Sequence, residues 1–187
     1  MILSNIHVLL DAARIDAELM DAAKALNPAH ESLFRNKKGG DEVLPSVAPY
    51  LFTYSGENNF ADFVMNGGWG NAWGIYADSV AGFEVLYKHF RRFLVIKTDD
   101  GESLYFRFYD PRVLRIFLST CDKYQLEAFF GPVDRYIMED EDPHRAVVFF
   151  LYRSELQTEY VAREQITAML RKTLPDPAQK KTFWNSL

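Results

Sequence analysis

The stretch YFRFYDPRVL, residues 105–114, joins an aromatic run to a sharp change of pattern at Asp110. Aromatic residues favour β-structure, and the alternation before Asp110 predicts a strand over residues 103–109. Asp110 is a favourable helix N-cap and Pro111 a favourable first helical residue, so a helix is expected over residues 112–121. The stretch therefore predicts a strand that leads directly into a helix, as in α/β folds.

Side chains of this predicted strand should alternate between two faces. The face expected to point into the core carries Leu104, Phe106 and Phe108, and the other face carries Tyr105, Arg107 and Tyr109. A charged group between two tyrosines needs a partner. For Arg107, a carboxylate or carbonyl of the same chain is the favoured partner, and a surface of another protein is the alternative.

Strands and helices interleave along the rest of the chain. Apolar runs predict strands over 6–10, 49–54, 72–77, 134–138 and 146–152, and a β-hairpin over 93–108 that turns at Asp99–Gly101. Helical spacing predicts helices over about 15–26, 58–66, 82–93, 123–130 and 157–172. We expect an α/β fold: a mixed β-sheet with helices packed on it, plus a short C-terminal helical extension.

The chain is expected to divide into an α/β domain over residues 1–140 and a C-terminal strand and helix extension over residues 141–187. This extension either packs on the sheet or forms a small lobe. A polar segment over residues 29–46 is expected to be a long loop in which Leu33 and Phe34 dock on the core.

Composition narrows the function classes. The 187 residues are 48% hydrophobic and 15% aromatic, which suits one packed core with aromatic residues left over for a contact surface. A net charge of −5 argues against nucleic acid as a partner. The single cysteine, Cys121, excludes an internal disulfide. There is no secretory signal and no apolar run near the roughly 20 residues that cross a bilayer, so we expect a cytoplasmic protein without membrane insertion.

The glycine-rich run GGWGNAWG, residues 67–74, lacks the Lys-Ser/Thr that follows a phosphate-binding loop. Trp69 and Trp73 are expected to pack over glycine backbone, and a peptide-binding surface is the alternative. Lys88, His89, Arg91 and Arg92 are expected on the solvent face of their helix, as a local positive patch.

Two features are candidate sites of chemistry. Cys121 falls on the apolar side of its predicted helix, where a cysteine usually acts as a small hydrophobic residue and not as a nucleophile. The acidic run EDEDPH, residues 139–144, is expected to be a solvated loop between strands, with a metal site or contact with a basic partner as alternatives. No cofactor is expected.

The segment RFYDPRVL, followed by a helix and then QLEAFFGPV, resembles the signature region of the type VI secretion effector chaperones, also called adaptors (the Tap or TEC family). HVLLDAAR, ESLF before APYLF, and WGNAWGIYADS resemble further blocks of that family in the same order. The resemblance covers roughly residues 6–138. It implies a protein without a catalytic centre that binds an effector toxin in the cytoplasm and passes it to the VgrG spike.

Seven residues are predicted to lie on or next to the protein-binding surface: Tyr105, Arg107, Tyr109, Arg112, Arg115, Trp69 and Trp73. Two other functions stay open. One is an enzyme of unknown type, a hydrolase that uses Cys121 or the acidic loop at 139–144. The other is a self-assembling scaffold that uses the surplus of aromatic residues.

Overall fold

The computed structural model describes residues 5–34, 45–56, 58–97 and 100–172. Its main strands are β1 (Asn5–Asp11), β2 (His30–Ser32), β3 (Pro49–Thr53), β4 (Gly74–Ser79), β7 (Arg135–Glu139), β8 (Arg145–Tyr152) and β9 (Glu155–Ala162). They form a seven-stranded sheet in the order β2-β3-β1-β4-β7-β8-β9, in which the pairs are antiparallel. Two short strands, β5 (Val95–Lys97) and β6 (Ser103–Tyr105), form a separate hairpin.

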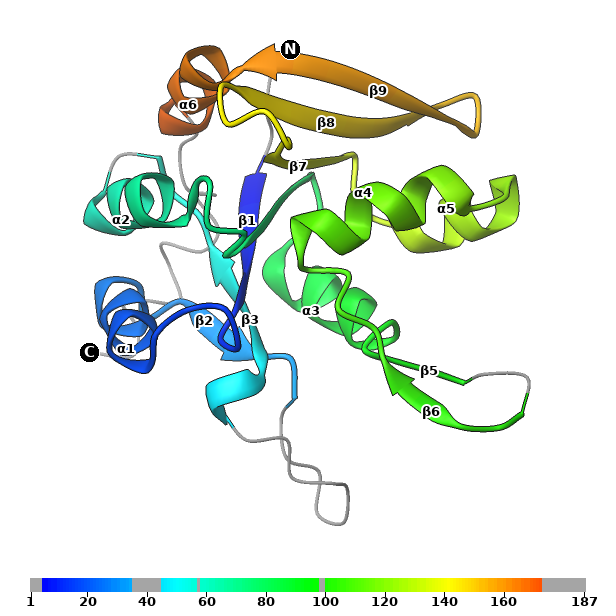
Figure 1. Ribbon diagram of the computed structural model, residues 1–187, viewed down its shortest axis with the longest axis horizontal. Coiled ribbons are helices and arrows are strands. Elements are labelled where there is room, and N and C mark those ends of the chain that lie inside the picture. The colour runs from blue at the N-terminus through cyan, green and yellow to red at the C-terminus, as the bar shows by residue number, and fades with distance from the viewer. Residues whose placement is uncertain (1–4, 35–44, 57, 98–99, 173–187) are drawn as a thin grey trace.

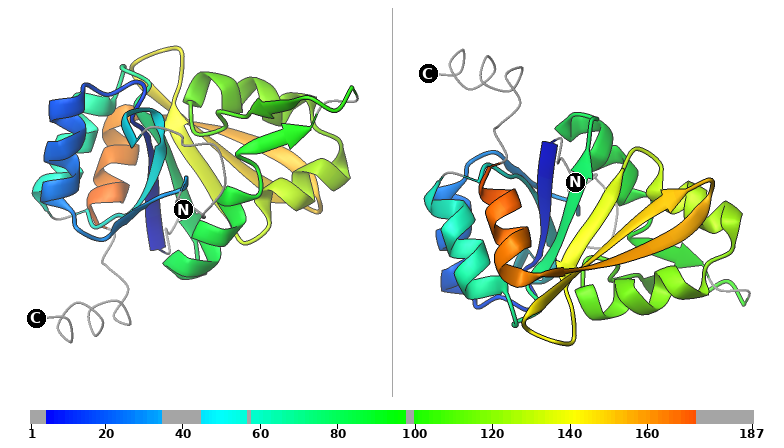
Figure 2. Two further views of the ribbon diagram at one scale, coloured as in Figure 1. Left: turned by 90° about the horizontal axis from the view of Figure 1, so that it is seen from below. Right: turned by 90° about the horizontal axis from the view of Figure 1, so that it is seen from above.

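The helices are α1 (Ala17–Leu26), α2 (Asn59–Gly68), α3 (Phe83–Arg91), α4 (Pro111–Thr120), α5 (Lys123–Phe130) and α6 (Arg163–Arg171), with a 3-10 turn at Pro45–Val47. The helices α1, α2 and α6 lie on one face of the sheet, and α3, α4 and α5 lie on the other (Figures 1 and 2). The expected α/β class is confirmed, with helices packed on a sheet and a short helix near the C-terminal end. The sheet is not mixed in its strand directions as expected, because all the described strand pairs are antiparallel.

Because helices cover both faces, the central strands are buried on both sides. In β1, Ile6, Val8 and Leu10 face a first core that includes α1, α2 and α6. Leu9 faces a second core, which α3, α4 and α5 close. Each fully buried aliphatic side chain contributes roughly 1.5–3 kcal/mol, so the near-continuous apolar run of β1 fits its central position.

The strand predicted over residues 103–109 is wrong in its second half, because β6 ends at Tyr105. Beyond it the backbone turns, and the Asp110 N–H donates to the carbonyl of Arg107 at 3.0 Å. Phe108 is buried in the second core and Phe106 packs against it, as predicted, but Leu104 is exposed and Tyr109 is buried, which is the reverse of what was expected for these two residues. Because the strand ends at Tyr105, the two-residue alternation does not continue, and the adjacent residues Phe108 and Tyr109 both pack into the second core. Asp110 and Pro111 do occupy the N-cap and first helical position of α4, as predicted.

The helix predicted over residues 157–172 is also wrong in its first part. β9 continues to Ala162, and α6 begins only at Arg163. Strand pairing with β8 along all eight residues replaces the expected first helical turns. Both β8 and β9 extend the same sheet as β7, and Ile166 and Leu170 of α6 pack into the first core. The described part of the expected extension is therefore docked; residues 173–187 lie outside the described residues.

Three further predictions can be compared with the structure. The segment expected to be a loop contains β2, and Leu33 is buried with Phe34 packed beside it, as predicted. The helical run after α4 is interrupted, because Asp122 starts α5 with a capping box. His89 does not face solvent as expected: it is buried, and its Nε2 lies 2.8 Å from the carbonyl of Phe129.

Candidate protein-binding surface

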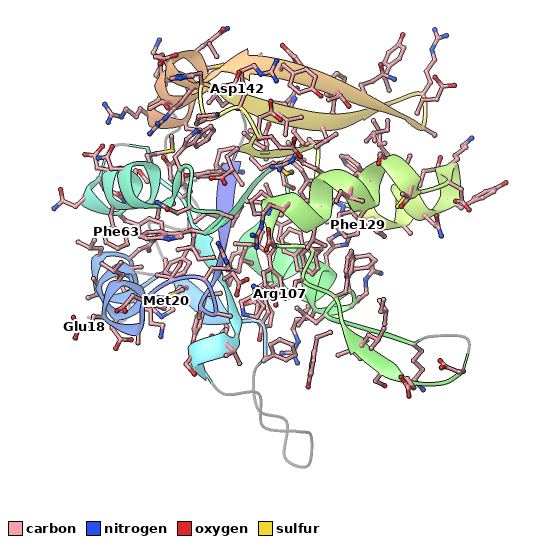
Figure 3. All side chains as sticks on the ribbon, viewed as in Figure 1. Glu18, Met20, Phe63, Arg107, Phe129 and Asp142 are labelled. Atoms are coloured by element: carbon pink, nitrogen blue, oxygen red, sulfur yellow. The ribbon has the colours of Figure 1, made fainter. Side chains whose placement is uncertain are left out.

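Several of the predicted residues meet where β1 ends, β4 begins and β7 ends. Leu10 pairs with Gly74 at this end of the strands, and Asp11 follows Leu10. Glu139 is the last residue of β7, which pairs with β4. The start of α4 lies beside the same end of these strands. Figure 3 shows Arg107 in this region, between the end of β1 and the start of α4.

Arg107 forms an ion pair with Asp11, and the hydrogen bond runs from the Arg107 Nη2 to the Asp11 Oδ2. The Asp11 side chain is fully buried, whereas that of Arg107 is 40% exposed. The other carboxylate oxygen of Asp11 accepts the Ala13 N–H at 3.0 Å. Burial alone would lower the pKa of Arg107, but the hydrogen bond and the charge of Asp11 raise it. The partner predicted within the same chain therefore exists.

Asp110 and Arg112 form a second pair at the start of α4. Asp110 accepts three hydrogen bonds from Arg112: from its backbone N–H at 3.0 Å, from Nε at 3.0 Å and from Nη2 at 2.6 Å. Burial tends to raise the pKa of Asp110, but the hydrogen bonds and charge of Arg112 lower it overall. Asp110 is buried, and the Arg112 side chain is 52% exposed, so the guanidinium reaches the surface.

Glu139 holds the glycine-rich run in place. Its carboxylate accepts the N–H of Gly70 at 2.7 Å and the N–H of Ala72 at 3.1 Å, where Ala72 has a φ of 53°. Arg115 donates to the backbone carbonyl of Glu139 at 2.7 Å and lies 3.8 Å from the carboxylate of Glu141. Burial raises the pKa of Glu139, and the two backbone hydrogen bonds only partly offset this.

These contacts form an arginine–carboxylate cluster, defined as Asp11, Arg107, Asp110, Arg112, Arg115 and Glu139. The three carboxylates belong to buried or half-buried side chains, and two of the three arginines reach solvent. Buried carboxylates paired in this way resist rearrangement, because either partner left alone carries a desolvation cost. The cluster therefore fixes the start of α4 against the ends of β1 and β7, and it leaves the side chains of Arg107 and Arg112 partly exposed to solvent.

Trp69 and Trp73 are buried. Trp73 packs so closely on α2 that a Cβ added at Gly67 would lie 2.6 Å from its ring. The predicted packing over glycine backbone is thus correct for Trp73. Trp69 donates its Nε1–H to the carbonyl of Pro143 at 3.2 Å. Arg163 lies over the Trp69 ring, at 5.7 Å from the centroid.

The two predicted tyrosines separate. Tyr109 is buried, whereas Tyr105 lies on the hairpin and is exposed. The structure thus brings Arg107, Arg112 and Arg115 together in the cluster and places Tyr105 on a different surface. That any of these residues binds another protein stays a prediction.

The alternative sites of chemistry have structural partners. In the acidic loop, Asp140 and Asp142 both pair with Arg145, at 2.7 and 3.4 Å. Among the described residues, no three His, Cys, Asp or Glu side chains are grouped to hold a metal ion. Burial, followed by the nearby Asp122, raises the pKa of Cys121, which is opposite to the shift that activates a thiolate nucleophile.

The profile of the family described as "Domain of unknown function (DUF4123)" matches residues 6–128, more than half of the chain. The chain belongs to the DUF4123 family. The match runs from β1 into α5 and includes five of the six cluster residues: Asp11, Arg107, Asp110, Arg112 and Arg115. No curated protein and no solved structure matches the chain.

The sequence did not identify Asp11 and Glu139 as members of the site in this DUF4123 protein. Asp11 ends an apolar strand, and a buried aspartate there signals that a cation lies nearby. That signal does not say which of the arginines is the partner. Glu139 is the first residue of an acidic run, and only its position as the last residue of β7, paired with Ala146 of β8, distinguishes it from the acidic residues that follow.

Proposed function

We propose that this DUF4123 protein is an adaptor that binds a type VI secretion effector in the cytoplasm and helps to load it onto the VgrG spike. The observation that carries the proposal is the family match over residues 6–128, which covers most of the stretch that resembles the effector chaperones. In this role the protein binds its partners without making or breaking a covalent bond.

The work done by such an adaptor is thermodynamic. A protein that binds one state of a partner stabilises that state by mass action, by about 2.7 kcal/mol at a concentration 100 times the Kd. Transfer to the spike then requires a competing interface of comparable size, since standard interfaces bury about 1,600 Å². No described helix is long and apolar enough to span a bilayer.

Exposed side chains of the arginine–carboxylate cluster are the proposed contacts. Arg112 is the better candidate of the two outward arginines, because its guanidinium is 52% exposed and its partner Asp110 keeps a backbone hydrogen bond without it. Arginine is enriched among residues that dominate binding energy. Loss of the Arg112 side chain should therefore weaken capture of the effector more than it weakens the fold.

Co-expression of the full chain with the products of the adjacent genes, followed by pull-down, tests this function. We expect an effector, a spike protein or both to co-purify. Arg112→Ala should reduce the captured amount about tenfold, whereas Lys123→Ala, an exposed control on α5, should not. Failure of the wild-type chain to retain any of these products would contradict the proposal. Turnover of a small molecule that Cys121→Ser abolishes would favour the hydrolase.

A further inference from the structure

The β5–β6 hairpin reaches away from the body of the molecule, beyond α3 (Figure 1). Val95 pairs with Tyr105, and Ile96 pairs with Leu104. Directly opposite residues of an antiparallel pair lie on the same face, so each face of the hairpin carries two large apolar side chains. These four side chains are between 43% and 56% exposed.

The base of the hairpin is packed against the rest of the molecule, while the apolar side chains of its two strands are exposed. Leu94 is buried, and its carbonyl accepts the Phe106 N–H at 3.0 Å. The Phe106 ring packs edge-on against Phe117, with 4.6 Å between centroids. Within the described part of the chain no third strand joins β5 or β6. An isolated two-stranded hairpin is marginally stable in water, and its open edges readily accept another strand.

Basic side chains lie at the end of α3 and on β5. Lys88, Arg91, Arg92 and Lys97 form no ion pair with a carboxylate in the described residues. Arg91 donates instead to the Tyr87 hydroxyl at 2.8 Å, and Arg92 lies 3.1 Å from the Nδ1 of His89. In a chain with a net charge of −5, these four side chains make a local positive patch that pairs with no carboxylate among the described residues.

The basic and apolar groups lie around one short segment. The Tyr87 hydroxyl, which accepts from Arg91, donates to the carbonyl of Ser32 at 3.1 Å. Two residues further on, the Phe34 ring packs edge-on against Tyr105, with 5.5 Å between centroids. The end of α3 and the Val95–Tyr105 face of the hairpin are therefore parts of one continuous surface.

We propose that the open edge of this hairpin, with the four apolar side chains on its two faces and the four basic side chains beside it, forms a docking surface for an extended apolar segment of the effector that is flanked by acidic side chains. An open strand edge selects an extended segment, because it offers main-chain hydrogen bonds and alternate side-chain positions. The positive patch selects acidic flanks by charge complementarity. The inference rests on the proposed function for the source of the segment, but the surface can be tested without the effector.

A labelled nine-residue peptide with five central valines and two glutamates at each end is the probe, and its fluorescence anisotropy with the full chain is the measurement. We expect saturable binding that weakens as salt rises. Ile96→Asp/Leu104→Asp should weaken it about tenfold, and Lys88→Glu/Lys97→Glu should do the same. The matched control is Tyr152→Asp/Tyr160→Asp on the β8–β9 hairpin, where both tyrosines are equally exposed; it should bind as the wild type does.

Absence of saturable binding would overturn the proposal, as would equal binding of a valine–lysine peptide or of the Ile96→Asp/Leu104→Asp variant. Light scattering adds a separate outcome: a wild-type dimer that this variant converts to a monomer assigns the surface to a second copy of the chain and overturns the proposal too. If the variant still captures the effector in a pull-down, the hairpin inference fails and the adaptor function stands. If the peptide binds but no effector is captured, the adaptor function and the effector as the source fail.

Discussion

Arg107 and Asp11 are separated by 96 positions in the chain, and their pairing is the contact that ties the start of α4 to β1. The two partners are unequal, because Asp11 is fully buried and Arg107 is partly exposed. A buried carboxylate depends on its cation more than the cation depends on it. Arg107 is therefore a structural residue, whatever it contributes to binding through its exposed side.

Arg107→Ala should lower the free energy of unfolding by about 2 kcal/mol. A fully buried pair would lose roughly 3–5 kcal/mol when one partner is removed, and the partial exposure of Arg107 reduces that loss. Urea denaturation followed by circular dichroism measures the change.

The control for this prediction is Arg107→Lys, which keeps a positive charge near Asp11 and should lose less stability. Arg112→Ala should also lose less, since Asp110 keeps the hydrogen bond from the backbone N–H of residue 112. An Arg107→Ala protein within about 0.5 kcal/mol of the wild type would show that the Asp11 pair has little structural weight.

For single residues, contacts with neighbours in the sequence could be predicted, whereas contacts with residues far away in the sequence could not. The N-cap role of Asp110 and the position of Pro111 depend only on neighbouring backbone, so the sequence sufficed to predict them. The need of Arg107 for a partner also followed from its surroundings. Its identity did not, because the pairing between Asp11 and Arg107 exists only once the whole sheet edge has formed.

The β8–β9 hairpin shows the same limit for an element. Its strands close at Tyr152 and Glu155, with Arg153 and Ser154 between them at φ values of 50° and 65°. Positive φ at both central residues defines a type I′ turn, which Asn-Gly normally supplies. Because Arg-Ser is not a typical turn sequence, the hairpin was not predicted. The helix that begins at Arg163 was therefore predicted to begin at residue 157, inside β9.

The same turn is expected to be strained, since non-glycine residues rarely adopt positive φ. Ser154→Gly should therefore raise the free energy of unfolding by about 0.5–1 kcal/mol, after the entropic cost of glycine in the unfolded chain is included. The shift of the urea midpoint at unchanged m-value measures it. Ser154→Ala keeps the strain and should give no gain; an equal gain from both variants would show that the backbone strain is not the cause.

For the whole molecule, His89 couples stability to pH. Burial is the main cause that lowers the pKa of His89 from 6.5; the hydrogen bond to Phe129 opposes the shift, and the charge of Arg92 adds to it. A neutral ring with its proton on Nε2 donates to the Phe129 carbonyl and accepts from Arg92 at Nδ1. Protonation of Nδ1 would place two donors face to face.

A lowered folded pKa means that the unfolded chain binds this proton more readily. The contribution of His89 is therefore fully present above about pH 6.5 and is lost as the pH falls through the folded pKa. The slope cannot exceed about 1.4 kcal/mol per pH unit for one proton. Glu139, with its raised pKa, has the opposite sign: its contribution is present below pH 4.5 and is lost as the pH rises through its folded pKa.

Urea titrations between pH 5 and 7 should show stability falling toward acid, and His89→Leu should reduce that slope although it lowers stability overall. His144→Leu is the control, because His144 is exposed and its backbone contacts do not need the ring. A slope that is unchanged in His89→Leu would mean that another group carries the pH dependence.

The class of the fold could be predicted from the sequence, because interleaved periods of two and 3.6 residues are local signals. The order of strands could not, since it depends on which edges remain open after β1, β3 and β4 have paired. The exposure of Tyr105 and the burial of Tyr109 could not be predicted either, because they depend on how the aromatic rings pack in the second core.

The position of β7 has a consequence for how the chain is divided. This strand lies outside residues 6–128, yet it sits between β4 and β8 and carries Glu139, which holds the Trp69–Trp73 backbone. A fragment limited to residues 6–128 would lack β7, so β4 would become an unpaired edge strand. The backbone N–H groups of Gly70 and Ala72 would also lose the carboxylate of Glu139 as their acceptor. The sheet and the cluster of this chain therefore extend beyond the region that the family profile matches.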